Sequence, residues 1–381
     1  MLFTPLWDLS NDPVLEILRE DFMRLLAIGF NIRHIACSAA RAGHQVFAVD
    51  CFRDLDLESC AIETAQIPRD QAEDLISTHV DRVHPDAIVL GPGLEEIQLK
   101  GERVLNNPPK KVSMVSDKLW MARWLQRQGF PFIKTELSAD GLQSPILVKP
   151  RKGAGGYGCR LVKNAAELNW AEGFVAQDFI AGEPASVSVI GNGHEARAVA
   201  VNEQLVGAKW AGASDFRYVG NITPLECPSC GIAKMAERIV AALGLLGSNG
   251  VDFLLTERGP VVVEVNPRFQ GSLDTVEMAT GINIFQSHLE AFAGILPRRP
   301  RACCTAGRAI IYADRNFEVG KDLRDLGDWI ADIPRPGSQI AAGDPILSIL
   351  ARGRNRYETL ALLMQRAARL DERIKFLQKE S

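Results

Sequence analysis

A lysine and a run of glycines follow one apolar stretch of the sequence. Residues 146–148 (Ile-Leu-Val) are expected to form a strand that delivers Lys149, and residues 153–158 read Gly-Ala-Gly-Gly-Tyr-Gly. Glycines let backbone N–H groups approach phosphate oxygens closely, and nearby lysines add fixed positive charge. The segment lacks the Gly-Lys-Ser/Thr of a Walker A loop. It therefore predicts either a phosphate-binding loop of another kind or a flexible turn.

Oxygen-bearing side chains recur further along the chain, in an apolar setting. Two apolar runs flank a Glu-Arg-Gly-Pro turn at residues 257–260, which predicts a β-hairpin. If the turn centres near Arg258, Asp252 lies opposite Glu264, and Asn266 shares the face of Glu264. Hard oxygen ligands suit Mg²⁺, which proteins usually hold with one or two carboxylates plus substrate phosphates. The alternative is a solvated face on which arginines pair with these acids.

A third segment, residues 174–183, is a short apolar strand that runs into a bend and ends at Glu183. The backbone of such a bend can offer a donor and an acceptor to the edge of a purine. Glu183 can accept hydrogen bonds from ribose hydroxyls. A plain loop between strands is the alternative.

The elements that position these residues begin with an α/β pattern. Apolar strands are expected at residues 24–30, 45–49 and 86–90, with a helix at 32–42, and this alternation indicates a parallel sheet. The turn at residues 29–33 reads Gly-Phe-Asn-Ile-Arg and lacks the GxGxxG pattern of a dinucleotide site. A structural or substrate-side Rossmann-like unit is favoured over an NAD site.

The remaining elements follow in a second unit. Asp117 is a good N-cap for a helix that closes at Gly129. Residues 161–300 alternate strands with helices, residues 301–350 are rich in strands and turns, and residues 356–379 have the periodicity of a long amphipathic helix.

Composition excludes several classes of protein. The chain has 381 residues, with 43 Lys and Arg against 47 Asp and Glu, and a net charge of −4. This balance argues against nucleic acid as a partner and against a polybasic membrane anchor. No apolar run reaches the ~18 residues that cross a bilayer. The first 21 residues lack the features of a secretory signal, so we expect a cytoplasmic protein.

The eight cysteines are too few for a disulfide scaffold in a chain of this length. We expect ordinary reduced thiols. Cys227 and Cys230 have half of a zinc-binding spacing, and whether they bind a metal stays open.

The order of these parts resembles the ATP-grasp superfamily, close to biotin carboxylase, carbamoyl-phosphate synthetase and D-alanine–D-alanine ligase. The resemblance covers about residues 24–300 and runs from Asp117-Lys118, through the strand lysine and its glycine loop, to Glu264-Val-Asn-Pro-Arg268. Residues 307–352 are similar to the tail of a group described as predicted ATP-dependent carboligases. The resemblance implies an α/β and α+β fold: a Rossmann-like N-terminal domain, a two-lobed ATP-grasp fold, a β-rich C-terminal segment and a terminal helix. The expected boundaries are an extension at 1–22, then domains at 23–112, 113–300 and 301–381.

The resemblance also implies roles for individual residues. Arg268 and Lys149 would be catalytic, with Arg268 facing the transferred phosphoryl group or the substrate carboxylate. A magnesium or manganese ion would be bound by Asp252, Glu264 and Asn266. ATP would be bound by Lys118, Lys149, Gly153, Gly155, Gly156, Gln177, Asp178, Phe179, Ile180 and Glu183.

The implied function is a ligase that forms an acyl phosphate from ATP and a carboxylate and then joins it to an amine. An ATP-dependent carboxylase that activates bicarbonate and a non-catalytic nucleotide-binding protein are the alternatives. A further basic residue near the γ-phosphate is either Lys209 or Arg217. Partners would be ATP and small carboxylates and amines, with a homodimer as the commonest symmetric assembly.

Overall fold

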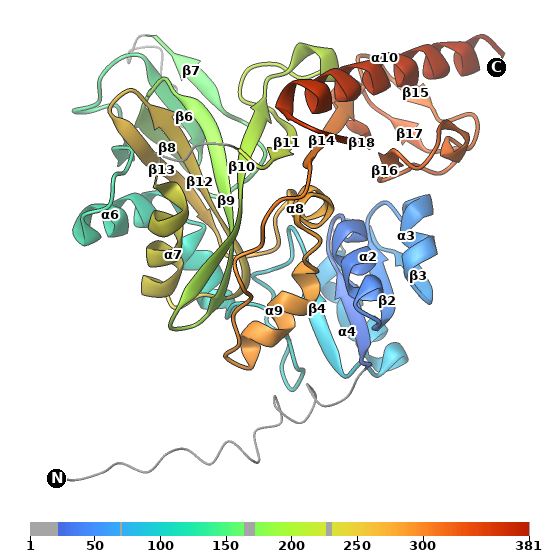
Figure 1. Cartoon of the computed structure of the whole chain (residues 1–381), viewed down its shortest axis with the longest axis horizontal. Helices are drawn as coiled ribbons and strands as arrows, with labels where there is room; N and C mark the ends of the chain where they lie inside the picture. Colours follow the sequence, from blue (N-terminus) through green and yellow to red (C-terminus); the bar gives the residue numbers. More distant parts are fainter. Residues whose placement is uncertain (1–21, 69–70, 164–171, 226–230, 381) are drawn as a thin grey trace.

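The computed structural model describes residues 22–68, 71–163, 172–225 and 231–380. The expected N-terminal extension falls almost entirely outside these residues, and so do Cys227 and Cys230. Figure 1 shows a sheet with flanking helices near the N-terminus, a large sheet through the middle of the molecule and a long helix at the C-terminus.

The N-terminal unit is a parallel sheet in the order β3-β2-β1-β4. Its central strands are apolar and almost wholly buried, as expected where helices cover both faces of a parallel sheet. This confirms the predicted Rossmann-like unit, although the first strand and the first helix are shorter than expected. The elements are β1 (Arg24–Ile28), α2 (Arg33–Arg41), β2 (Gln45–Asp50), α3 (Leu55–Cys60), β3 (Glu63–Gln66), α4 (Ala72–Val83) and β4 (Ala87–Leu90).

The expectation of reduced thiols is wrong at one pair of cysteines. Cys37 on α2 and Cys60 on α3 form a disulfide across a Cα–Cα distance of 4.9 Å. The two helices pack side by side, which brings cysteines 23 residues apart within bonding range. Sequence spacing alone does not reveal such a pairing, because it depends on helix packing.

A small antiparallel sheet follows, in the order β5-β8-β6-β7. The helix before it is set by its ends: the Asp117 carboxylate accepts from the N–H groups of Leu119 and Trp120, and Gly129 closes the helix with a φ of 73°. The elements of this part are α5 (Pro109–Val115), α6 (Lys118–Gln128), β5 (Thr135–Glu136), β6 (Ile146–Pro150), β7 (Arg160–Val162) and β8 (Phe174–Asp178).

The largest sheet has the order β13-β12-β9-β10-β11-β14-β18-β16, and its pairs are antiparallel. Successive residues of β9 serve opposite faces, since Val187 and Val189 join the core around α7 whereas Ile190 joins the core around α9. The elements are β9 (Glu183–Asn192), β10 (Ala196–Val206), β11 (Tyr218–Thr223), α7 (Ile232–Ala242), β12 (Leu246–Thr256), β13 (Gly259–Asn266), α8 (Leu273–Thr280) and α9 (Ile284–Phe292).

The C-terminal residues extend that same sheet. In Figure 1, α10 lies across β14 and β18, and Leu363, Ala367 and Leu370 of α10 are buried in the same core as these strands. This confirms the β-rich segment and the terminal helix. The elements are β14 (Thr305–Tyr312), β15 (Phe317–Glu318), β16 (Ile330–Ala331), β17 (Gln339–Ile340), β18 (Pro345–Gly353) and α10 (Arg356–Glu380).

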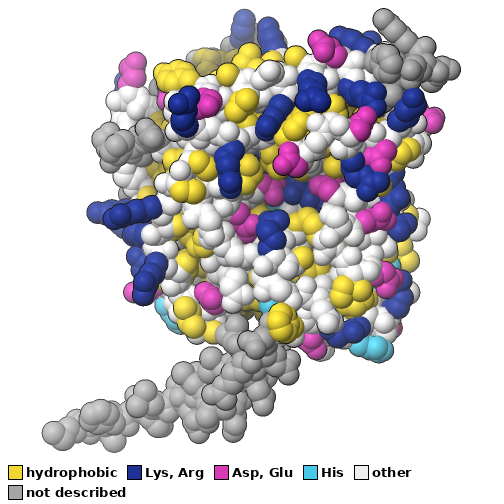
Figure 2. Space-filling model, turned by 45° about the vertical axis from the view of Figure 1, so that its right-hand side comes forward, with side chains coloured by type: hydrophobic (Ala, Val, Ile, Leu, Met, Phe, Trp, Pro, Cys, Tyr) yellow, Lys and Arg dark blue, Asp and Glu magenta, His cyan; other side chains and the backbone are white. Residues whose placement is uncertain are grey.

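The described surface mixes both signs of charge. On the face that Figure 2 shows, Lys and Arg side chains are interspersed with Asp and Glu side chains. None of the helices in the described ranges combines the length and apolar character needed to cross a membrane.

Candidate active site

Lys149 lies at the base of the glycine loop. β6 places its side chain in a wall of a cavity of about 430 Å³, where only 4% of its surface is exposed. Burial lowers the pKa of Lys149 to about 8, with Lys118 adding to the effect and Glu264 opposing it. The lysine is therefore mostly charged at pH 7 and loses its charge as the pH rises through about 8.

The glycine loop lines the same cavity with Gly153, Gly155 and Gly156. All three have positive φ, and so does Gly158. Residues other than glycine rarely adopt this backbone conformation. Gly156 packs so tightly that an added Cβ would lie 1.8 Å from the Phe216 carbonyl oxygen. The loop thus depends on glycine for both its conformation and its contact with the segment before β11.

The hairpin pairs Asp252 with Glu264, as the sequence predicts, but by a different route. The turn pairs Thr256 with Gly259, so its centre lies half a residue earlier than Arg258. A bulge between Asp252 and Phe253 then shifts the register by one residue. The two offsets cancel at the carboxylates.

Hydrogen bonds hold the two carboxylates close together. Gln204 donates to Asp252 Oδ1 at 3.0 Å, and the Asn266 amide nitrogen lies 3.1 Å from Asp252 Oδ2 and 3.5 Å from Glu264 Oε1. Burial, reinforced by Glu264, raises the pKa of Asp252 well above its usual range. Burial alone would also raise the pKa of Glu264, but Lys118 and Lys149 lower it overall. The two carboxylates therefore shift in opposite directions, and Asp252 keeps its proton to higher pH than Glu264.

Lys118 connects the glycine loop to the carboxylates. Its side chain, from the first turn of α6, donates to the Gly153 carbonyl at 2.8 Å and lies 3.6 Å from Glu264 Oε2. The capping carboxylate of Asp117 also binds Arg151. The N-terminus of α6 is thereby fastened to the beginning of the loop.

Arg268 lies at the other side of the carboxylates and also lines the cavity. It forms an ion pair with the buried Glu95 at 3.1 Å, and its guanidinium donates to Asn266 Oδ1 at 3.3 Å. Glu95 in turn accepts from the N–H of Gly93. A Gly-Pro-Gly turn at residues 91–93 follows β4, but this motif does not by itself identify Glu95 as a partner of Arg268.

The segment at 174–183 is not brought to the wall of this cavity. Gln177 is buried and donates to Thr135, and Asp178 accepts from the Gln143 N–H. Phe179 is 38% exposed and Glu183 is exposed at the start of β9. Neither these residues nor Ile180 are among those that line the cavity.

The two further basic residues differ in their surroundings. Arg217 stacks on Tyr157 of the glycine loop, with 3.6 Å from its guanidinium carbon to the ring centre, and donates to the Gly343 carbonyl. Lys209 is exposed. Neither lines the cavity. Tyr218 and Ser272 do line it. His34 and Gln204 also line it, and sequence reasoning did not single out either residue.

Comparison with known proteins identifies the central part of the chain. The model of the ATP-grasp domain matches residues 115–272. These residues form an ATP-grasp domain. They include the glycine loop, the lysines, the carboxylate pair and Arg268.

Relatives extend the similarity beyond this domain. An uncharacterized protein of Methanocaldococcus jannaschii is 24% identical over 360 residues, 87% of this chain and 88% of that protein. A D-alanine–D-alanine ligase of Bordetella pertussis is 29% identical over 196 residues, which cover 45% of this chain and 61% of the ligase. This alignment spans less than two thirds of the ligase's own length.

The fold is also that of a solved enzyme. Biotin carboxylase from Campylobacter jejuni, crystallised as a complex with β-γ-ATP, superposes with a TM-score of 0.72. The match covers 89% of each chain at 18% identity, so it establishes the fold alone.

Proposed function

We propose that this protein is an ATP-dependent carboxylate–amine ligase. The observation that carries the proposal is the convergence of Lys118, Lys149 and Arg268 with the Asp252–Glu264 pair around one cavity. Three cationic side chains around one cavity can neutralise the negative charge of phosphoryl oxygens. Paired carboxylates suit the divalent ion that accompanies ATP. The similarity to a D-alanine–D-alanine ligase supports the same class of reaction.

The nucleotide would lie under the glycine loop. Lys118 and Lys149 would bind its phosphates, and the backbone N–H groups of Gly153, Gly155 and Gly156 would cover them. Residues 177–180 would frame the adenine and Glu183 would bind the ribose. Because these last residues do not line the cavity, they require a test of their own, which is nucleotide affinity after Glu183→Gln.

The donor set of the hairpin fits Mg²⁺ or Mn²⁺. Asp252 and Glu264 are buried and repel each other, and a divalent cation bound by them would offset this repulsion. The described residues contain no group of three or more His, Cys, Asp and Glu side chains arranged for a metal, which agrees with an ion that takes its remaining ligands from phosphates. Asn266 presents its amide nitrogen to the carboxylates, so it would act as a ligand only with its amide turned over. When bound, the ion would neutralise charge on the phosphoryl oxygens and orient the triphosphate.

The reaction would proceed in two steps. A substrate carboxylate oxygen attacks the γ-phosphorus, ADP leaves, and an acyl phosphate forms. The amine then attacks the carbonyl carbon, phosphate leaves with the bonding pair of electrons, and the amine loses a proton. Arg268 would hold the carboxylate and the transferred phosphoryl group, while Lys149 would balance the charge that develops on the oxygens.

The test is ADP release by purified protein with MgATP. The panel contains acetate, propionate, lactate, succinate and the common amino acids, each with and without glycine or ammonium as the amine. Release that requires both an acid and an amine supports the proposal. Release that depends on bicarbonate supports a carboxylase instead, and tight ATP binding without turnover supports a non-catalytic nucleotide-binding protein.

Cellular location and assembly belong to the same proposal. We propose a cytoplasmic protein that acts on ATP and small molecules and that forms a homodimer. Subcellular fractionation and light scattering of the purified chain test these two points.

A further inference from the structure

His34 and Pro92 of the N-terminal unit and Gly271 and Ser272 of the large lobe line part of the same cavity, which we call its second end. None of these four residues belongs to the proposed nucleotide-binding set. This second end is therefore the space that remains for the substrate that ATP activates or the amine that joins it.

His34 stands out in the wall of this end. Only 4% of its surface is exposed, and no group of the described residues hydrogen-bonds to Nδ1 or Nε2. Burial lowers the pKa of His34 to about 3, so the ring is neutral and offers one donor and one acceptor. A buried polar group without a partner costs about 1–3 kcal/mol, which the fold tolerates most readily where a ligand supplies the partner.

The position of His34 in the fold points to a ligand independently. β1 lies between β2 and β4 in the sheet. The strands β2 and β3 are added on one side of β1, whereas β4 is added on the other side, so the strand order reverses between β1 and β4. Ligands of open parallel sheets bind beyond the carboxyl ends of the strands at such a point. His34 lies in the first turn of α2, directly after β1, and Pro92 follows β4.

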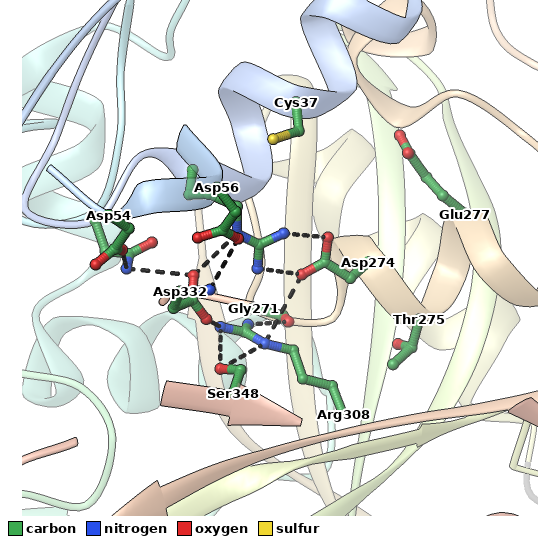
Figure 3. A network of polar contacts seen from close by, with 12 residues as sticks. Cys37, Asp54, Asp56, Gly271, Asp274, Thr275, Glu277, Arg308, Asp332 and Ser348 are labelled. Carbon is green, nitrogen blue, oxygen red and sulfur yellow. Dashed lines mark hydrogen bonds and ion pairs between the residues drawn. The ribbon is translucent and has the colours of Figure 1, made fainter. Parts of the chain in front are cut away.

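The charges behind this wall are already paired. Arg33 binds Asp274 at 2.8 Å and Asp332 at 3.0 Å. Figure 3 shows Arg308 of the same cluster, which binds Asp332 at 2.6 Å. Arg308 also donates to the carbonyl of Gly271, which fixes the turn opposite His34.

The cluster and the Glu95–Arg268 pair leave the His34 end without an unpaired cation in the described part of the chain. A second anionic group would find no counter-charge there. An uncharged group that both donates and accepts hydrogen bonds would satisfy the neutral imidazole.

We propose that His34 is a substrate-binding residue that hydrogen-bonds an uncharged polar group, such as a hydroxyl or a free amine, of the acceptor substrate. The inference rests on the proposed ligase function and deepens it. It assigns the selection of the acceptor to the first turn of α2, and it separates this role from nucleotide binding.

The kinetic test uses His34→Phe, which keeps the size of the ring and removes its hydrogen bonds. With the most active acid and amine of the panel, we expect the KM for one of them to rise 10-fold to 100-fold while the KM for ATP stays within twofold. We also expect a preference for lactate over propionate, or for serine over alanine, to collapse in the variant. His34→Gln should restore part of it. Unchanged KM values and unchanged preferences would overturn the proposal.

A matched control is His288→Phe. His288 is also a buried neutral histidine, but it accepts from the Ser248 N–H at 2.8 Å and lies 2.9 Å from the Leu105 carbonyl oxygen. Its replacement should lower the melting temperature and leave acceptor preference unchanged. His34→Phe should keep or raise the melting temperature. A fall of several degrees for His34→Phe would mean that its imidazole serves the fold, and would overturn the proposal.

A binding measurement separates this inference from the ligase proposal. Ring nitrogen signals of ¹⁵N-histidine protein saturated with MgADP are recorded with each compound of the panel, and the His34 signal is assigned by its loss in His34→Phe. If the wild type never releases ADP but lactate or an amino acid shifts this signal, the ligase proposal fails and His34 remains a binding residue. If ADP is released and no compound shifts the signal, ordered water satisfies the imidazole and the His34 proposal fails.

Discussion

At the scale of single residues, the buried carboxylate pair is the feature that most clearly requires a compensating positive charge. Burial and mutual repulsion oppose two negative charges at Asp252 and Glu264, and they raise the pKa of Asp252. Occupancy of the cavity by a divalent ion and by phosphates would change that balance. The site is therefore built for a charged ligand rather than for the stability of the fold.

Glu264→Gln should reduce ADP release by roughly 10²–10³-fold, because the amide cannot supply the negative charge that the cation requires. The melting temperature should stay close to that of the wild type. Glu257→Gln, an exposed position in the turn of the same hairpin, serves as the control. A Glu264→Gln protein with full activity would remove the metal-binding assignment.

Lys149 makes nucleotide binding depend on pH. In the free protein it loses its proton as the pH rises through about 8. Above that value, binding of an anionic nucleotide must take up a proton, so affinity should fall by up to about tenfold per pH unit. Lys149→Arg keeps its charge and should show a much weaker decline between pH 7 and pH 9.5. Calorimetric titration with MgADP gives both affinities, and parallel pH profiles of the two proteins would contradict this explanation.

At the scale of elements, two glycines of the loop allow the effect of backbone strain to be measured separately from the effect of steric contact. Gly155 and Gly156 both have positive φ, at 69° and 75°. An added Cβ at Gly155 meets only ordinary contacts from 3.5 Å, whereas at Gly156 it meets backbone at 1.8 Å. The two positions therefore form a matched pair within one loop.

Gly156→Ala should weaken MgADP binding at least tenfold, because the loop must move away from Phe216. Gly155→Ala carries only the strain of a left-handed alanine, about 1–2 kcal/mol, and should weaken binding less. Fluorescence titration with a labelled nucleotide measures both. Equal losses would show that backbone strain alone controls the loop.

The same scale explains what the sequence could predict. The helix from Lys118 to Gln128 follows from its Asp117 cap and from Gly129, both of which act within a few residues. The predicted pairing of Asp252 with Glu264 is correct. The predicted centre of the turn is wrong by half a residue, and a bulge that the sequence pattern does not predict compensates for this error. Features that depend on a few neighbouring residues, such as helix caps, could be predicted from the sequence, whereas irregularities of strand pairing could not.

At the scale of the whole molecule, contacts between distant segments escaped prediction. The bond from Arg33 to Asp332 spans 299 residues. His34 and Pro92 reach the cavity only because the N-terminal unit packs against the large lobe. Neither spacing nor composition encodes such contacts directly. The Cys37–Cys60 pair escaped prediction for the same reason.

The acidic cluster behind the cavity should make stability depend on pH. Burial, followed by Asp332, Asp50 and Asp56, raises the pKa of Asp54 to about 9. The folded state then binds more protons than the unfolded state between about pH 4 and pH 9, so stability falls as the pH rises through this window. Ionisation in that window would cost at most about 1.4 kcal/mol per pH unit.

Asp54→Asn should remove this cost. Its gain in melting temperature over the wild type should be larger at pH 8.5 than at pH 5, as measured by thermal unfolding. Asp371→Asn, at an exposed carboxylate on α10, should give no such pH-dependent gain. An equal effect of Asp54→Asn at both pH values would show that Asp54 does not carry the proton.

The junction between β11 and β14 has a practical consequence for anyone who expresses part of this chain. Residues 305–353 supply three neighbouring strands of the sheet that begins with the hairpin, and a fragment cut to residues 115–272 would lose them. Such a fragment would offer β11 as an open edge to any other strand, which invites self-association. Trimming should therefore spare everything from Met23 to the end of α10, even though the recognisable signature occupies less than half of that length.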